Sequence, residues 1–327
     1  FMDGFSYADQ AYKWDVTSST LSITTTTPRT PGGYKAQLSN NSIYKTIPSS
    51  TKVIAGMGFN TATNWWVTFY GDAGVTSHIT VIRSSTTGFI EIRRGNENGT
   101  VLATGTQVTA NGQWNYVEVS VTISDTVGEV HVRLNGGTTD EVSFTGDTKN
   151  GGTVNATDRL RMAGGSSNFI SDVYVLDDTG PTLNSFLGDV VVRTITPTGN
   201  GASSQLVGSD GNSTDNYLLV DEHGYSSVDY VGSATATQKD TYAMADLPAG
   251  VTTVYAVQVM GFMEKSDATT AQSRLLLRSG GTDYTGVTRT LTTSTTGYYE
   301  LYTQDPATSA AWTPSGVNGI ETGMEVL

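Results

Sequence analysis

The chain has 327 residues, of which 37% are hydrophobic and only 15% are charged, so its surface must be largely neutral and polar. The formal net charge of −13 argues against a protein that binds DNA or RNA, because phosphate binding requires a basic face. The absence of cysteine excludes disulfides, thiolate metal sites and a cysteine nucleophile. No apolar run approaches the roughly 20 residues that cross a bilayer, and Phe1-Met2-Asp3-Gly4 lacks the basic and apolar regions of a secretory signal, so we expect neither feature.

The first half of the sequence alternates apolar and polar residues in short runs. In residues 116–123 the valines and Ile123 fall on one side, which predicts a strand with one buried face. Residues 129–134 repeat this pattern, and Asn135-Gly136-Gly137 predicts a hairpin turn, because Asn and Gly tolerate a positive φ. Further strands are predicted at residues 53–59, 65–70, 79–83, 89–94, 138–144 and 170–176. Such strands, separated by Gly and Asn turns, predict an antiparallel β-sandwich or jelly roll.

A domain boundary is predicted at residues 181–187, because Gly180 and Pro181 interrupt a strand ladder. The predicted domains are a β-sandwich at residues 1–180 and a second, mostly-β domain at residues 188–327. Within the second domain, residues 189–196 predict a strand covered on both faces and residues 199–216 a long loop. More strands are predicted at 241–245, 253–264, 273–279, 298–302 and 319–326, with short helical turns at 243–247 and 305–311.

No pattern of catalytic residues is present. His78 and His131 are expected as exposed strand residues, and His223 as a solvated loop residue, because its consecutive acidic neighbours cannot all face one ion. The sequence contains no Gly-x-Ser-x-Gly motif, no phosphate-binding Gly-rich loop and no Glu-x-Asp-x-x-Glu pattern of the kind found in concanavalin-like glycosidases. We therefore expect no catalytic residue and no enzyme activity.

Calcium is the remaining candidate ion. Asp210-Gly211-Asn212-Ser213-Thr214-Asp215 supplies hard oxygen ligands on a loop, but it lacks the final Glu of an EF-hand loop and its Gly is misplaced. Asp177-Asp178 is a weaker candidate. Because acidic Gly-rich turns are usually only turns, we expect no bound metal and no cofactor, with calcium as the alternative.

Aromatic side chains are the better candidates for binding. Trp65, Trp66, Tyr70, Trp114 and Tyr116 could form a platform on which sugar rings stack, but alternation must turn some of them into the core. Trp114 is expected in the core or at a strand edge. Of the adjacent Trp65 and Trp66 one should face outward, and an exposed tryptophan marks a ligand site or a subunit contact. Trp65, Trp66 and Tyr70 are therefore the candidate ligand or subunit contacts.

Two neighbouring segments carry a family resemblance. Gly112-Gln113-Trp114-Asn115-Tyr116-Val117-Glu118-Val119, followed by Gly128-Glu129-Val130-His131-Val132-Arg133-Leu134-Asn135-Gly136, resembles the laminin-G/concanavalin A-like jelly-roll family. Met2-Asp3-Gly4-Phe5 and Ile170-Ser171-Asp172-Val173-Tyr174-Val175-Leu176 are similar to the version found in tailed-bacteriophage proteins. Leu275-Leu276-Leu277-Arg278-Ser279-Gly280-Gly281 is similar to a module that often follows that sandwich in phage structural proteins. The calcium site of some laminin-G domains has no matching ligand set here.

The resemblance implies a non-catalytic structural protein on the outside of a tailed-phage virion, assembled in the host cytoplasm. Its partners would be other virion proteins, further copies of itself in a homo-oligomer, and a host-surface glycan. A tail fibre or baseplate component and a capsid decoration protein both remain open. Two alternatives stand beside this reading: a carbohydrate-binding module that uses exposed aromatic residues, and a glycoside hydrolase or lyase, which no motif supports.

Overall fold

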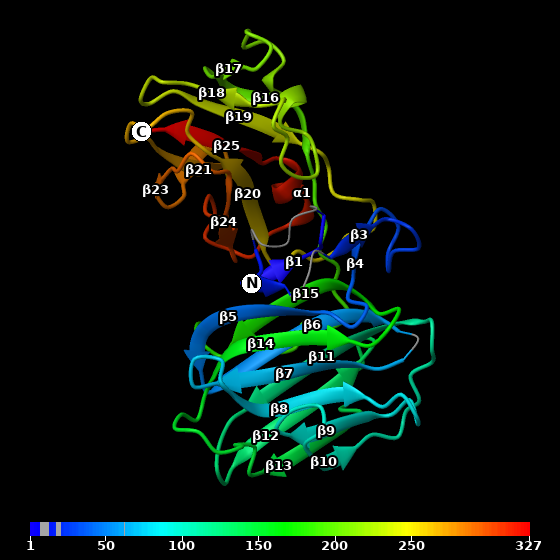
Figure 1. Cartoon of the computed structure of the whole chain (residues 1–327). Coiled ribbons are helices and arrows are strands. Elements are labelled where there is room, and N and C mark those ends of the chain that lie inside the picture. The colour runs from blue at the N-terminus through cyan, green and yellow to red at the C-terminus, as the bar shows by residue number, and fades with distance from the viewer. Residues whose placement is uncertain (7–12, 18–20, 62) are drawn as a thin grey trace. The chain divides into compact units, whose positions relative to one another are not determined.

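The computed structural model describes residues 1–6, 13–17, 21–61 and 63–327, which form two compact units, Phe1–Arg193 and Thr194–Leu327. Almost all regular structure in these residues is β-strand (Figure 1); the exceptions among them are a 3-10 turn, η2 (Asn216–Leu219), and one short helix, α1 (Pro314–Asn318). The predicted fold class, an antiparallel β-sandwich followed by further mostly-β structure, is confirmed. In the described part of the chain, no helix is long and apolar enough to cross a membrane.

Two antiparallel sheets face each other in the first unit. Sheet 1 has the order β13-β12-β11-β6-β15-β4-β3, with β1 beside β15. Its strands are β1 (Met2–Asp3), β3 (Ser22–Thr24), β4 (Lys35–Gln37), β6 (Lys52–Asn60), β11 (Trp114–Thr122), β12 (Gly128–Leu134), β13 (Val142–Gly146) and β15 (Phe169–Asp177). Sheet 2 has the order β10-β9-β8-β7-β14-β5-β2. Its strands are β2 (Val16–Thr17), β5 (Ser42–Ser50), β7 (Trp65–Gly71), β8 (Thr76–Arg83), β9 (Ile90–Arg94), β10 (Thr100–Thr104) and β14 (Thr157–Gly164).

Alternation along the strands sorts side chains between the core and the two outer faces. On β7, Trp65, Val67 and Phe69 are fully buried in the core between the sheets, whereas Trp66 and Tyr70 are partly exposed on the other side. Trp65 stacks on Phe59 of sheet 1, with ring centroids 4.5 Å apart. Contacts of this kind join the sheets, since removing one large buried aromatic side chain typically costs about 3–5 kcal/mol.

The predicted hairpin at Asn135-Gly136 is present between β12 and β13. Asn135 has a φ of 52° and Gly136 a φ of 72°, which are the positive values that a tight two-residue turn requires. On β12, Val130 and Val132 are buried in the core while Glu129 is exposed and His131 and Arg133 are partly exposed, as the alternation predicts. The returning strand begins at Val142, later than the predicted residue 138, because 138–141 form the loop after the turn.

Strand β11 differs from the prediction, because both of its faces are buried. Val117, Val119 and Val121 lie in the core, but Tyr116 and Glu118 on the opposite face are each only 1% exposed. A segment of chain, residues 186–192, covers that face: Phe186, Leu187 and Val190 pack on a cluster formed by Ile54, Tyr116 and Tyr174. We call residues 186–192 the covering segment.

Because the covering segment packs on sheet 1, the first unit extends beyond residue 180, the predicted end of the first domain. The residues predicted as a linker, 181–187, belong to the first unit, and the two units divide between Arg193 and Thr194. The predicted strand at 189–196 is wrong, since these residues form no strand. The alternating valines there have another cause: Val190 packs on sheet 1, whereas Val191 is 41% exposed.

Gly56 on β6 shows how tightly sheet 1 is packed. A Cβ atom at Gly56 would lie 2.1 Å from Cε1 of Tyr174, so Gly56→Ala must displace the Tyr174 ring. We expect this substitution to lower the free energy of unfolding by about 1–3 kcal/mol, measured by urea denaturation. Gly199, which has open space around its position, is the control: Gly199→Ala should change stability by no more than about 0.5 kcal/mol. Equal stability of the two variants would contradict the expected clash.

The second unit contains one larger and two smaller antiparallel sheets. Sheet 3 has the order β16-β19-β25-β21-β22, with β23 beside β21, and two further pairs are β17–β18 and β20–β24. The strands are β16 (Pro197–Ser204), β17 (Val207–Gly208), β18 (Val231–Gly232), β19 (Lys239–Met244), β20 (Val257–Met263), β21 (Gln272–Ser279), β22 (Thr282–Thr285), β23 (Arg289–Thr290), β24 (Thr296–Tyr302) and β25 (Glu321–Val326). Their core includes Val259, Leu277 and Trp312.

Three predictions for this unit need correction. The stretch 199–216, predicted as a loop, begins with β16, which pairs with β19 through shifts in register. Residues 243–247 form no helical turn, because β19 continues to Met244. Residues 305–311 form a turn closed by a bridge between Asp305 and Ala310 rather than a helical turn, and the carboxylate of Asp305 accepts a hydrogen bond from the backbone of Ala307.

Candidate functional site

The outer face of sheet 2 gathers aromatic and cationic side chains from three adjacent strands. Strand pairing places Tyr44 of β5 opposite Arg161 of β14, and Arg159 of β14 opposite Tyr70 of β7. Trp66 of β7 lies opposite Ala163, which follows Arg161 as the next residue of β14 on the same face. Because residues that face each other across antiparallel strands point to the same side, these residues share one surface, which we call the Arg–aromatic face.

The three aromatic residues predicted as contacts occupy different places. Trp66 and Tyr70 lie partly exposed on the Arg–aromatic face. Trp65 has no exposed surface and belongs to the core, because it alternates with Trp66 along β7. Trp114 is partly exposed at the start of β11 and Tyr116 is buried, so neither joins the same surface.

Arginine side chains stack on the aromatic rings of this face. The guanidinium carbon of Arg159 lies 4.7 Å from the ring centroid of Tyr44, and that of Arg161 lies 5.8 Å from Tyr44 and 5.7 Å from Trp66. Contacts of this geometry attract a cation to the face of the ring. They hold each guanidinium flat against a ring, and stacking of this kind does not itself use the in-plane nitrogen donors.

Burial raises the pKa of Tyr70 above its usual value, and this effect outweighs the hydrogen bond and positive charge of Arg161, which act in the other direction. The Tyr70 hydroxyl is therefore protonated at neutral pH and can donate or accept a hydrogen bond. Its position next to Arg161 adds a polar group to the aromatic surface.

The carboxylates on this side of sheet 2 are already paired with arginines. Arg93 donates from Nε to Oε2 of Glu91 at 3.0 Å and from Nη1 to the carbonyl oxygen of Glu97 at 2.7 Å. The Glu97 carboxylate lies 3.7 Å from Nη1 of Arg161. Arg159 differs from both of these arginines: among the described residues, no carboxylate oxygen lies within 4.0 Å of its guanidinium and none of their groups accepts a hydrogen bond from it.

Three nitrogen donors on the face lack an acceptor. They are Nε1 of Trp66, Nε of Arg159 and Nε of Arg161, all of which are buried without a hydrogen-bond partner in the part of the chain that the structure describes. An unsatisfied buried donor costs roughly 1–3 kcal/mol, so three on one surface need an explanation. A ligand that brings acceptors and shifts the flexible arginine side chains would supply it.

Sequence reasoning missed Tyr44, Arg159 and Arg161, because it did not predict β5 and β14. A usable signal was present in residues 157–164, where Leu160 and Met162 alternate with Arg159 and Arg161. Such alternation predicts a strand with one apolar and one cationic face. The pairing of β14 with β7, which joins the arginines to Trp66 and Tyr70, has no signal in a single sequence.

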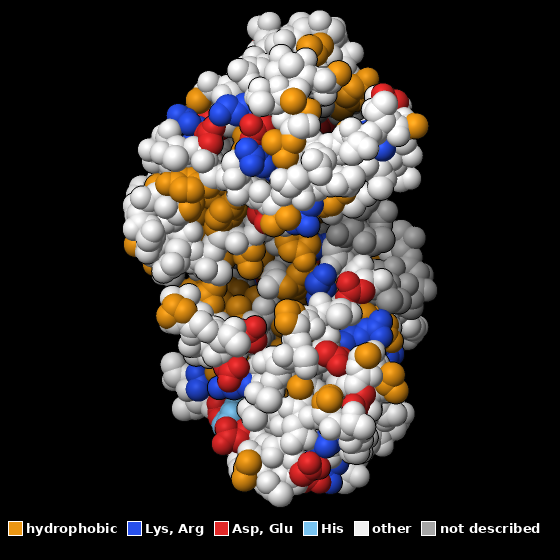
Figure 2. All heavy atoms as spheres, turned by 90° about the vertical axis from the view of Figure 1, so that its left-hand side faces the viewer, with side chains coloured by type: hydrophobic (Ala, Val, Ile, Leu, Met, Phe, Trp, Pro, Cys, Tyr) orange, Lys and Arg blue, Asp and Glu red, His pale blue; other side chains and the backbone are white. Residues whose placement is uncertain are grey.

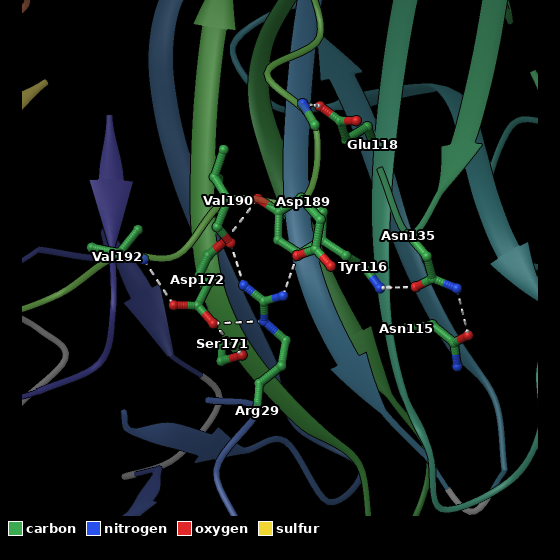
Figure 3. Close-up of polar contacts among 11 residues, drawn as sticks. Arg29, Asn115, Tyr116, Glu118, Asn135, Ser171, Asp172, Asp189, Val190 and Val192 are labelled. Atoms are coloured by element: carbon green, nitrogen blue, oxygen red, sulfur yellow. Dashed lines mark hydrogen bonds and ion pairs between the residues drawn. The ribbon is translucent and has the colours of Figure 1, made fainter. Parts of the chain in front are cut away.

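A second polar cluster lies on the outer face of sheet 1, beneath the covering segment (Figure 3). Arg29 donates from Nε to Asp172 at 2.8 Å and from its two Nη atoms to the Asp189 carboxylate and the Val190 carbonyl, while its guanidinium lies 4.6 Å from the Tyr116 ring centroid. Asp172 also accepts from the backbone of Val192 at 2.9 Å. Burial alone would lower the pKa of Arg29, but the ion pairs and hydrogen bonds with Asp172 and Asp189 outweigh it and raise the pKa.

Glu118 completes this second cluster. Its Oε1 atom accepts hydrogen bonds from the backbone of Leu187 at 2.8 Å, from the backbone of Gly188 at 2.9 Å and from the hydroxyl of Tyr174. The charged groups are thus paired with one another and with the backbone of the covering segment. This cluster holds the covering segment on sheet 1, and we interpret it as structural.

The predicted ion sites contain no assembled ligand set. Within the described ranges, no group of three or more His, Cys, Asp or Glu side chains could hold a metal ion. Oδ2 of Asp210 accepts a hydrogen bond from the Asn212 side chain at 2.6 Å, and Oδ1 of Asp177 accepts from the Thr179 hydroxyl at 2.6 Å. Both carboxylates therefore stabilise turns.

The two histidines of the first unit, His78 and His131, lie in different environments. His131 is partly exposed on β12 and lies 2.7 Å from Asp140, as expected for a surface strand residue. The prediction for His78 is wrong: it is fully buried, and Nδ1 accepts a hydrogen bond from the backbone of Asn150 at 3.3 Å. A loop from a distant part of the sequence covers it, and burial lowers the pKa of its imidazole.

The surface drawn in Figure 2 is mostly neutral, with acidic and basic side chains next to each other in small groups, as the low content of charged residues predicts. Exposed pairs of this kind, such as Arg133 with Asp140, contribute little to stability. Arg159 has no such acidic partner within ion-pair distance among the described residues, although it lies on a surface that carries two other arginines.

No protein-family model matches the chain, and no curated protein matches it. Solved structures are similar in fold. A Bacillus subtilis protein of unknown function with a galectin-like fold is 9% identical, with a TM-score of 0.37, covering 54% of this chain and 94% of its own. The carbohydrate-binding module CBM66 from Bacillus subtilis is 7% identical, with a TM-score of 0.32, covering 46% and 90%. The Caenorhabditis elegans galectin LEC-6 is 10% identical, with a TM-score of 0.30, covering 41% and 89%. Likeness at this level does not identify a ligand, because one fold hosts many unrelated functions.

Proposed function

We propose that the first unit binds carbohydrate through the Arg–aromatic face of sheet 2. The observation that carries this proposal is the combination on one surface of aromatic rings, Tyr44, Trp66 and Tyr70, with nitrogen donors that lack a partner. Sugars present apolar C–H faces and polar hydroxyl edges. A surface with both rings and hydrogen-bonding groups matches this amphipathic character.

The position of this face on rigid strands favours binding over catalysis. Regular strands hold side chains in fixed register, which lowers the entropy cost of recognition. The two carboxylates near the face, Glu91 and Glu97, are each held by an arginine and both lie on the β9 side of the surface. The proposed role is therefore non-catalytic binding, in agreement with the carbohydrate-binding alternative drawn from the sequence.

Trp66→Ala tests the proposal. Loss of the indole should weaken saccharide binding at least about tenfold, equal to about 1.4 kcal/mol, because both a ring surface and a donor are removed. Binding would be screened on a glycan array and the dissociation constant measured by isothermal titration calorimetry.

The matched control for this experiment is Trp114→Ala, which removes a partly exposed tryptophan from sheet 1 of the same unit. It should leave saccharide affinity unchanged. Equal loss of binding in the two variants, or an absence of binding by the unmodified protein to every glycan on the array, would refute the proposal.

The wider biological setting stays a prediction from sequence resemblance. In that reading, the protein lies on the outside of a tailed-phage virion, as a tail fibre or baseplate component or as a capsid decoration protein, in contact with other virion proteins and further copies of itself. A saccharide-binding face would then serve attachment to a host-surface glycan. Immunogold labelling of particles with an antibody to this chain would test the setting independently of the binding experiment.

A further inference from the structure

The charge balance of the Arg–aromatic face is opposite to that of the whole chain. Its charged side chains are Arg93, Arg159 and Arg161, with Glu91 and Glu97 beside them. Glu91 pairs with Arg93, and Glu97 lies near Arg161, whereas no carboxylate oxygen of the described residues lies within 4.0 Å of the Arg159 guanidinium. The Asp158 carboxylate nearby is held by the backbone amides of Ala73 and Gly74, so Arg159 keeps donors for an anionic group from outside the chain.

The unsatisfied hydrogen-bonding groups on the face also favour an anionic ligand. The groups without a partner there, Trp66 Nε1, Arg159 Nε and Arg161 Nε, are all donors. The threonine hydroxyls beneath them are already engaged, since Thr68 and Thr80 lie 3.0 Å apart and Thr80 also donates to the carbonyl of Gly95 at 2.7 Å. A neutral sugar needs acceptors for its hydroxyl protons as well as donors, whereas a carboxylate or sulfate needs donors only.

The orientation of Arg159 suits an anionic group. Its guanidinium stacks on Tyr44, and its side chain also packs beside Gly74. Stacking restricts the planar guanidinium without using its donors. The planar guanidinium fork matches the paired oxygens of a carboxylate or sulfate, and charge-assisted hydrogen bonds of this type are about twice as strong as neutral ones.

We infer that the ligand of the Arg–aromatic face is an anionic saccharide, whose carboxylate or sulfate group binds Arg159 and Arg161 while a neighbouring sugar ring stacks on Trp66. This inference rests on the proposed carbohydrate-binding function and specifies its ligand class. Carboxylated and sulfated sugars share the recognising chemistry, so the experiment must separate the two sources.

The experiment measures binding of the full chain to two matched pairs of polysaccharides. Polygalacturonate is compared with its methyl ester, in which the same backbone has lost its charge, and dextran sulfate is compared with dextran. A glycan array that includes sialylated glycans and their neutral counterparts broadens the test. We expect at least about tenfold tighter binding to the charged member of at least one pair, and the pair that shows it identifies carboxylate or sulfate as the anionic group.

Two variants test whether the preference arises on this face. Arg159→Gln should reduce binding to the charged saccharide about ten- to hundredfold, which corresponds to one lost charge-assisted interaction, and should reduce binding to the neutral member by a clearly smaller factor. Arg133→Gln removes the same charge from sheet 1 of the same unit and should alter neither. Circular dichroism and thermal unfolding establish that each variant is folded.

The possible outcomes distinguish a wrong ligand class from a wrong carbohydrate-binding function. Equal affinity for charged and neutral saccharides, with binding still lost in Trp66→Ala, overturns the anionic ligand and leaves the carbohydrate-binding function in place. Equal effects of Arg159→Gln and Arg133→Gln overturn the assignment to this face. No binding to any saccharide overturns both the function and the ligand class.

Discussion

Replacing Arg29 by methionine should lower the free energy of unfolding of the first unit by about 3–5 kcal/mol, the cost of removing one partner from a buried ion pair. The Arg29 and Asp172 side chains are each only 7% exposed, with Nε and Oδ2 2.8 Å apart. Methionine fills similar space but leaves the Asp172 carboxylate charged, with hydrogen bonds from Ser171 and Val192 as its remaining support. The Val190 carbonyl also loses its donor.

Urea denaturation followed by fluorescence of the buried tryptophans would measure this loss. Hydrogen exchange, measured by mass spectrometry on the full chain, would report on the covering segment, whose backbone amides should exchange faster in the variant because Arg29 anchors it. Arg94→Met is the control, because Arg94 of β9 forms a partly exposed pair with Asp147 and should contribute less than about 1 kcal/mol. If Arg29→Met were as stable as this control, the second cluster could not be what holds residues 186–192 on sheet 1.

The strands of the first unit could be predicted where one face is apolar and the other polar. Residues 129–134 fall within β12 in this way, whereas 53–59 and 65–70 fall within β6 and β7 as runs rich in apolar residues. The predicted exposure was wrong where another segment of the chain covers the polar face of a strand. Glu118 reads as a solvent-facing residue, yet it is 1% exposed, because the covering segment returns over β11 from about 70 residues further along the chain.

The candidate site could be predicted only in part. Period-two alternation indicated that one of Trp65 and Trp66 must face outward, but it could not say which neighbours the outward residue would have. The pairing of β7 with β14 and of β14 with β5 brings Tyr44, Arg159 and Arg161 to that surface. This arrangement depends on strand order, and strands adjacent in a sandwich are often distant in sequence.

In the second unit, the predicted strands at 273–279 and 298–302 fall within β21 and β24, but β16 was missed because its composition is polar. Strand β16 is Pro-Thr-Gly-Asn-Gly-Ala-Ser-Ser, a composition typical of a loop. It pairs with β19 only through shifted registers, and part of its backbone is held by side chains: Glu321 accepts from Ala202 at 2.8 Å and Thr241 from Ser203 at 3.1 Å. Intrinsic strand propensity carries little of this information.

Asp240→Ala should destabilise the second unit by roughly 3–5 kcal/mol, because several buried donors lose their acceptor at once, at about 1–3 kcal/mol each. Asp240 is fully buried. Its Oδ1 accepts from the backbone of Gln205 at 2.6 Å and of Leu206 at 2.8 Å, and its Oδ2 accepts from Asn216 at 2.6 Å and from the Tyr242 hydroxyl at 2.9 Å. Burial and then the Asp240 charge raise the pKa of Tyr242, which keeps that hydroxyl a donor.

These hydrogen bonds attach residues 205–216 to β19, so the loss should appear locally as well as globally. Hydrogen exchange of the full-chain variant should increase most at Gln205 and Leu206, whose backbone amides donate to Asp240, and the midpoint of urea unfolding of this unit should fall. Asp210→Ala is the control, because the exposed Asp210 carboxylate supports only a turn at Asn212 and its removal should cost no more than about 1 kcal/mol. Unchanged exchange at Leu206 in Asp240→Ala would mean that packing of the buried Leu206 side chain, rather than the shared carboxylate, holds this segment in place.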